Sequence, residues 1–210
     1  MPTETFFNLP DEKRELICNV AVDEFAEYAF NQASINRIVA NAGIAKGSFY
    51  QYFQDKKDLF FYILQRIADE KMKFIAPTWE NLGDKDLFTS LRELTVTAVK
   101  FAHQHPKFSA IGSWIVANRS TEIFNEIMVD NTDTMNAFFG ALIEKAIARG
   151  EIRSDFRTEM LSQIIASMYL CAVDYPTEFA SEEFQEDMLE SVDTFLAVLK
   201  HGISRSDTEP

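Results

Sequence analysis

Residues 34–57, SINRIVANAGIAKGSFYQYFQDKK, constrain the fold more than any other stretch of this chain. Ser34 is a good N-cap, because its hydroxyl can accept a hydrogen bond from the free backbone N–H groups at the start of a helix. Gly43 ends that helix, because glycine adopts the left-handed conformation at low cost. A second short helix follows, with two phenylalanines four residues apart on its inner face. Asp55 then caps a third helix, so the stretch predicts a helix-turn-helix.

The second helix begins with residues that suit contact with DNA. Gly47 and Ser48 keep it narrow where a helix in the major groove would meet base edges. Within residues 34–57, four basic side chains stand against one acidic one, a local charge of about +3 if each ionised group counts as one unit. The whole chain has a net charge of −13. A basic island in an acidic protein indicates attraction to a polyanion. Two short packed helices also occur in many proteins that bind no nucleic acid, so spacing alone leaves both interpretations open.

The run from Ile38 to Leu59, IVAxAGIAKGSFYxYFxxKxxL, resembles the DNA-binding signature of the tetracycline-repressor (TetR) family. Two positions depart from that signature. Ala45 stands where the family often has Ser or Thr, which weakens the cap of the second helix, and Phe49 replaces a common Leu or Ile. The resemblance implies a DNA-binding head over residues 1–57 and an effector-binding and dimerisation body over residues 58–210.

The resemblance and the chemistry of the side chains together give a set of candidate DNA contacts. We expect Lys46 and Ser48, with Gln51, to contact the groove. Ala45 and Gly47, at the start of the same helix, complete the set of candidate DNA contacts. Hydroxyl and ammonium groups reach phosphates most readily. The predicted phosphate contacts are Ser34, Tyr50, Tyr52 and Lys56.

Outside this stretch the chain reads as helices throughout, which predicts an all-α fold of about nine helices with a three-helix head. The expected helices outside residues 34–53 cover about 9–30, 55–76 (ending before Pro77), 85–104, 107–117, 121–149, 158–180 and 182–201. Charge is unevenly distributed along them. Residues 1–66 carry 7 basic and 9 acidic groups, a net of −2, and residues 67–210 carry 13 and 24, a net of −11. We therefore expect the acidic body to face away from DNA.

The last two helices, about 158–180 and 182–201, carry apolar stripes broader than one surface helix needs. A single internal core explains such stripes equally well. The resemblance implies that they pair with their copies in a second chain as a four-helix bundle. A two-fold homodimer of this kind would place two recognition helices one DNA turn apart, which predicts a palindromic operator of double-stranded DNA.

Large apolar side chains in the body are candidates to line an effector pocket, although ordinary core packing is the simpler explanation for any one of them. The resemblance implies a small-molecule effector, and an apolar aromatic cavity suits a lipophilic one. The candidates are Trp114, Met128, Met135, Phe138, Phe139, Met168 and Tyr169.

Other classes of chemistry find little support. The sequence has no nucleophile elbow, Walker loop or dinucleotide fingerprint, so we expect no enzyme and no cofactor. His103 and His105 are too few ligands for a metal site, and the two cysteines, Cys18 and Cys171, form no C-x-x-C pair. No apolar run approaches the ~18 residues of a membrane span, and the start shows no signal peptide, so we expect a cytoplasmic protein.

The main hypothesis is therefore a sequence-specific transcriptional regulator, most simply a repressor that a small effector releases from its operator. The alternative is an interaction or ligand-binding module of the same fold that no longer reads DNA.

Overall fold

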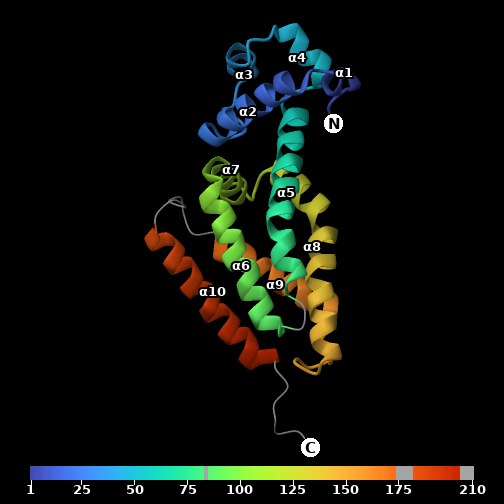
Figure 1. Cartoon of the computed structure of the whole chain (residues 1–210), viewed down its shortest axis with the longest axis vertical. Coiled ribbons are helices and arrows are strands. Elements are labelled where there is room, and N and C mark those ends of the chain that lie inside the picture. Colours follow the sequence, from blue (N-terminus) through green and yellow to red (C-terminus); the bar gives the residue numbers. More distant parts are fainter. Residues whose placement is uncertain (83–84, 174–181, 204–210) are drawn as a thin grey trace, which may run out of the picture. The chain divides into compact units, whose positions relative to one another are not determined.

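The structure, a computed structural model, describes residues 1–82, 85–173 and 182–203, with the side chains in these ranges except those of 128–135, 168–173, 182–188 and 203. Within this part of the chain the regular structure is helical, as the sequence predicts (Figure 1). The helices are α1 Glu4–Phe7, α2 Asp11–Glu27, α3 Ile35–Asn41, α4 Lys46–Tyr52, α5 Lys56–Glu80, α6 Leu87–Gln104, α7 Pro106–Ala117, α8 Glu122–Ala148, α9 Thr158–Val173 and α10 Glu182–Ile203. The one helix that the sequence did not predict is α1, whose four residues are too few to show a helical period.

The described chain packs as two compact units. Unit 1 consists of Met1–Phe74 and His105–Gly112, and unit 2 consists of Ile75–Gln104 and the described residues from Ser113 on. The predicted head, residues 1–57 with the first half of the helix from 55 packed against it, lies within unit 1. The apolar face of α5 belongs to the core of the first helices, with the ring of Phe60 lying 4.8 Å from that of Phe25.

Aromatic side chains dominate the core of unit 1. Phe6, Phe49, Phe53 and Phe60 are all essentially inaccessible to solvent. They come from α1, α4, the residue after α4, and α5. The start of α7 belongs to the same unit, where the Lys107 ammonium donates to the Asp23 carboxylate of α2 at 2.5 Å. The short helices α3 and α4 are too small to be stable alone, so this shared core holds them in place.

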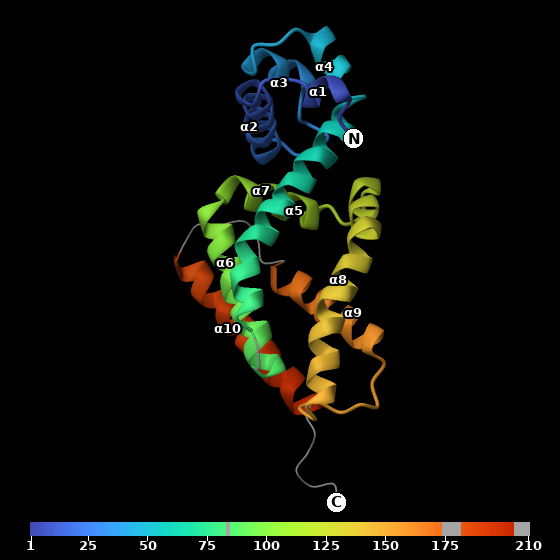
Figure 2. The same cartoon turned by 45° about the vertical axis from the view of Figure 1, so that its right-hand side comes forward.

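Mostly aliphatic side chains form the core of unit 2, and most of them come from α6, α8, α9 and α10. Helix α9 contacts α8, behind which it crosses in Figure 2, and α10 contacts both α6 and α9. Each helix contributes residues at helical spacing to one buried cluster, which includes Leu87, Leu91 and Leu94 of α6, Leu142, Ile143 and Ala146 of α8, Leu161 and Ile165 of α9, and Val192, Leu196 and Leu199 of α10. The apolar stripes of the last two helices therefore serve this internal core at least in part.

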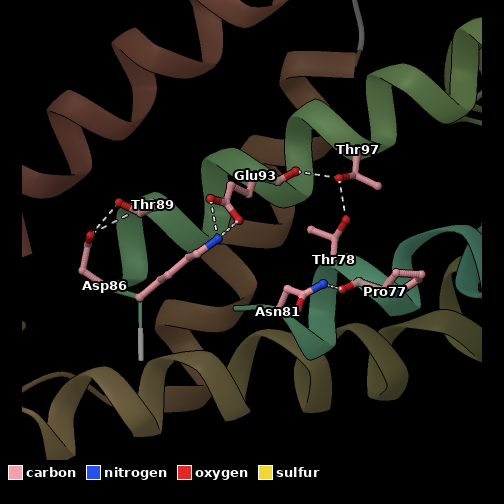
Figure 3. A network of polar contacts seen from close by, with 8 residues as sticks. Pro77, Thr78, Asn81, Asp86, Thr89, Glu93 and Thr97 are labelled. Carbon is pink, nitrogen blue, oxygen red and sulfur yellow. Dashed lines mark hydrogen bonds and ion pairs between the residues drawn. The ribbon is translucent and has the colours of Figure 1, made fainter. Parts of the chain in front are cut away.

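The prediction that the helix of about 55–76 ends before Pro77 is wrong, because α5 continues through this proline to Glu80. A proline inside a helix removes one backbone hydrogen bond, because it has no N–H. The carbonyl of Pro77 accepts from both the backbone and the side chain of Asn81, at 3.2 and 2.8 Å, which closes the final turn (Figure 3). A hydrogen bond of 2.9 Å between the hydroxyls of Thr78 and Thr97 ties this end to α6.

The start of α6 is held by a carboxylate cap. The Asp86 side chain accepts from the N–H groups of Phe88 and Thr89, and from the Thr89 hydroxyl at 2.5 Å (Figure 3). Burial raises the pKa of Asp86, but these hydrogen bonds and the nearby Lys200 charge outweigh it, so that the net effect lowers this pKa. None of the helices in the described ranges combines the length and apolarity needed to cross a bilayer.

Candidate nucleic-acid interface

The turn between α3 and α4 has the geometry that the sequence predicts. Gly43 has a φ of 63°, in the left-handed region. Its N–H donates to the Ala40 carbonyl, and the N–H of Ile44 donates to the Val39 carbonyl at 3.0 Å. This is the Schellman pattern that closes a helix end on a glycine. It fixes the direction in which the chain enters α4.

The recognition helix α4 has one buried and one exposed side. Phe49 and Tyr52 are buried, whereas Lys46, Gly47, Tyr50 and Gln51 are exposed and Ser48 is half-buried. A Cβ added to Gly47 would meet no atom of the described chain within 4 Å. Ala45 precedes the helix and makes no side-chain cap, as its methyl group requires. Of the predicted groove residues, Lys46 and Gln51 are thus exposed and Ser48 is half-buried.

A buried carboxylate of α2, which the sequence analysis missed, positions the start of α3. Glu24 is only 5% exposed. Its Oε1 accepts the Ser34 N–H at 2.6 Å and the Arg37 Nη2–H at 2.6 Å, and both of its oxygens accept from Arg37 Nε at 3.0 Å. Its position among Ile17, Ala21 and Phe25, at helical spacing, is the signal that could have revealed it.

Arg37 therefore stabilises the fold of the head by linking α3 to α2. Its guanidinium also donates to the Gln32 carbonyl at 2.9 Å and lies 4.0 Å above the Tyr28 ring. The hydrogen bond with Glu24 raises the pKa of Arg37, as expected for a paired cation. Since Glu24 lies outside residues 34–57 in sequence but beside Arg37 in space, the charge of about +3 counted along the sequence overstates the positive charge presented here.

Lys56 also makes contacts within the head. Its ammonium donates to the Ala33 carbonyl at 2.8 Å and lies 4.6 Å from the centre of the Phe30 ring. Burial lowers the pKa of Lys56, with the Glu24 charge acting in the opposite direction. The structure thus gives Lys56 a role in holding the loop before α3, and a phosphate contact would use its remaining donors.

Two of the predicted contact residues differ from expectation in detail. Ser34 occupies the N-cap position of α3, but its hydroxyl makes no capping hydrogen bond, because Glu24 instead fixes the Ser34 backbone. Tyr52 is only 5% exposed and its ring lies 6.1 Å from that of Phe6. A side chain packed in this way supports the helix end, which argues against Tyr52 as a phosphate contact.

The predicted effector residues are only partly described. Met128, Met135, Met168 and Tyr169 lie outside the residues whose side chains the structure describes. Phe139 is buried in the unit 2 core, Phe138 lies 4.4 Å from the Trp79 ring, and Trp114 is half-buried.

Unit 2 contains a small pocket, and it is not lined by the predicted effector residues. It offers about 30 Å³, room for little more than a water molecule. Its lining comes from the end of α5, the start of α6 and the end of α8: Trp79, Leu82, Lys85, Leu87, Ser90, Leu142, Lys145 and Arg149. Within the described residues, no cluster of His, Cys, Asp and Glu could hold a metal ion.

Comparison with known proteins supports the interpretation of this site. Residues 17–63 match the family model described as bacterial regulatory proteins, tetR family. The transcriptional repressor BepR of Brucella suis is 26% identical over 165 residues, which cover 75% of this chain and 77% of BepR. An HTH-type transcriptional regulator of Staphylococcus aureus strain USA300 is 40% identical over 58 residues, 28% of this chain and 31% of that protein.

Solved structures extend the likeness to the whole chain. A TetR family transcriptional regulator from Chloroflexus aurantiacus is 31% identical, with a TM-score of 0.71, over 98% of this chain and 100% of that one. A structure from Syntrophomonas wolfei, 22% identical over 94% and 98% of the two chains, shares the fold with a TM-score of 0.72. Members of this family regulate transcription and are not enzymes. The helix-turn-helix geometry and this full-length likeness show that the chain belongs to the TetR family of DNA-binding transcriptional regulators.

Proposed function

We propose that this regulator is a repressor that binds a palindromic operator as a homodimer and leaves it when a small molecule binds the body. The observation that carries the DNA-binding part is the division of α4 into two sides. Lys46, Gly47, Tyr50 and Gln51 are exposed while Phe49 and Tyr52 are buried. A helix that a protein core holds on one side, and that presents polar and small residues on the other, can enter a major groove.

Each exposed residue has a proposed role. Lys46 and Ser48, with Gln51, contact base edges or the groove, and Gly47 allows the backbone to approach closely. The Tyr50 hydroxyl, on a side chain 50% exposed, and the Ser34 hydroxyl hold phosphates. Lys56 contributes at most its remaining donors, since one already binds the Ala33 carbonyl.

The proposed homodimer forms through α9 and α10. Their described residues include apolar side chains that the internal core leaves uncovered: Met160 is 61% exposed, Ile164 43% and Val198 65%. A face of this kind on two neighbouring helices suits an isologous contact with a second copy. The two heads of such a dimer would read half-sites about 34–36 Å apart.

The proposed effector is small and lipophilic, and it acts by binding two states of the dimer unequally, because equal affinity for both would shift nothing. Helices α5 and α7 each contribute residues to both compact units, so they are elements through which such a difference can pass. The described pocket of about 30 Å³ is far smaller than an effector site, and effector binding would have to open space in the body. The cytoplasm, where genomic DNA lies, is the compartment that this proposal requires.

The test is a selection of random-sequence duplexes with the purified full chain, followed by fluorescence anisotropy on the selected duplex and on a shuffled one at two salt concentrations. We expect a palindromic sequence, two chains per duplex by sedimentation, and affinity that falls steeply with salt. Lys46→Ala should weaken operator binding about 5- to 100-fold, the range of a lost groove or phosphate contact.

The matched control is Lys100→Ala, which removes an exposed lysine of α6 in the other unit and should leave operator binding unchanged. Equal and weak binding of the wild-type chain to every duplex would refute the repressor proposal. That result would favour the alternative, a module of the same fold that no longer reads DNA.

A further inference from the structure

The end of the recognition helix is closed by a segment far away in sequence. Gln51 and Tyr52 are the last two residues of α4, and their carbonyls have no partner within the helix itself. The Thr3 hydroxyl donates to the Gln51 carbonyl at 2.6 Å, and the Thr3 N–H donates to the Tyr52 carbonyl at 2.9 Å. One threonine, 48 positions upstream, thus serves both carbonyls.

The same segment is anchored by an aromatic side chain. Phe6 of α1 is 0% exposed, and its ring lies 4.7 Å from that of Phe53 and 5.4 Å from that of Tyr62. Behind it, Arg14 of α2 donates to the carbonyls of Phe7 and Leu9, at 3.0 and 3.3 Å. Figures 1 and 2 both show α1 lying beside α4. Tyr62 and Arg14 thus hold the segment through contacts outside α4.

These contacts matter because α4 has little stability of its own. It has seven residues, and Ala45 gives it no side-chain cap at its start. Isolated helices of this length are not stable in water, so the order of the last turn depends on its external partners. That turn carries Tyr50 and Gln51, both exposed on the side assigned to DNA.

We propose that Thr3 and Phe6 are positioning residues for operator recognition, which hold the last turn of α4 in the geometry that fits the groove. This inference rests on the proposed function of α4 as the recognition helix. Neither side chain needs to touch DNA for this role. If the last turn frays, the fraction of protein ready to bind falls, and the apparent affinity falls with that fraction.

The test compares Thr3→Val with Thr5→Val in the full chain. The first substitution keeps the size and β-branching of the side chain but removes the hydroxyl that binds the Gln51 carbonyl. The second makes the same change on Thr5, an exposed residue of α1, the helix that Thr3 precedes. We expect Thr3→Val to weaken binding to the selected operator about 3- to 10-fold, the worth of one net hydrogen bond. Binding to a shuffled duplex should be unchanged, because the positive charges that drive it are unchanged.

A second readout does not need DNA. In Thr3→Val, hydrogen exchange of the Phe53 N–H, which donates to the Phe49 carbonyl at 2.8 Å, should become several-fold faster than in Thr5→Val. Equal exchange and equal operator affinity in the two variants would overturn the proposal. A parallel loss on operator and shuffled duplex would also overturn it, because residue 3 would then be a phosphate contact itself. Failure of the wild-type chain to select any operator would refute the proposed function. The hydrogen-exchange rates of Thr3→Val and Thr5→Val would still test whether Thr3 stabilises the end of α4.

Discussion

Gly47→Ala should make the folded protein more stable and the repressor worse at binding its operator. An added Cβ at this position meets no described atom within 4 Å, and Gly47 lies inside α4 without a positive φ. Alanine restricts the unfolded chain more than glycine does, so the change should stabilise each protomer by about 0.5–1 kcal/mol. For a chain of this length, that corresponds to a rise in Tm of about 1–4 °C.

The same methyl group would lie on the open surface of the recognition helix. If Gly47 allows close approach to the groove, operator affinity should fall at least tenfold, within the cost of about 1–3 kcal/mol of one mismatched base pair. Differential scanning calorimetry at fixed protomer concentration measures the stability, and fluorescence anisotropy on the selected operator measures the affinity.

Two other glycines provide controls for this substitution. Gly140→Ala adds a methyl in α8 that, among the described atoms outside its own helix backbone, meets only the Ser162 hydroxyl at 3.7 Å, an ordinary contact, so stability should rise and DNA binding should stay the same. Gly43→Ala places a side chain at a φ of 63° and should destabilise the turn by about 1–2 kcal/mol. A Gly47→Ala protein that binds its operator like the wild type would refute the placement of this helix face in the groove. Loss of stability in Gly47→Ala would refute the open space above it.

Two further substitutions test the contacts that hold the helices. Glu24→Gln keeps one oxygen for the Ser34 N–H but loses charge-assisted hydrogen bonds to Arg37, so the free energy of unfolding in urea should fall by about 2 kcal/mol. The control, Glu12→Gln on an exposed residue of α2, should lower it by under about 1 kcal/mol. Equal losses in the two variants would contradict a structural role for the buried carboxylate. Asp86→Ala removes the cap of α6 and should cost about 1 kcal/mol at pH 7. Because folding lowers the pKa of Asp86, this difference should persist above its unfolded pKa of about 4 and shrink as the pH falls through the lower folded value; a difference that does not change down to pH 2 would contradict this assignment.

Local features of the fold were predictable from the sequence, because neighbouring residues determine them. Gly43 ends α3 in the left-handed conformation, and the Asp55 carboxylate accepts the Asp58 N–H at 2.8 Å at the start of α5. Thr121 caps α8 in the same way, accepting the Phe124 N–H. Caps and turns join residues a few positions apart, so residue type and spacing are enough to predict them. The predicted helix end before Pro77 was wrong, because α5 continues past this proline and the side chain of Asn81 helps to close its last turn.

The sequence by itself determined that the chain is helical, where its helix-turn-helix lies, and which side of α4 carries small and polar groups. The tertiary structure decided which of these groups remain available to DNA. Arg37 donates hydrogen bonds to Glu24, thirteen positions away, and Lys56 donates one to the Ala33 carbonyl, twenty-three positions away. Thr3 closes α4 from forty-eight positions away. Folding brings such distant partners together, so the periodicity of a single helix, which reports only its neighbours three and four residues along, contains no information about them.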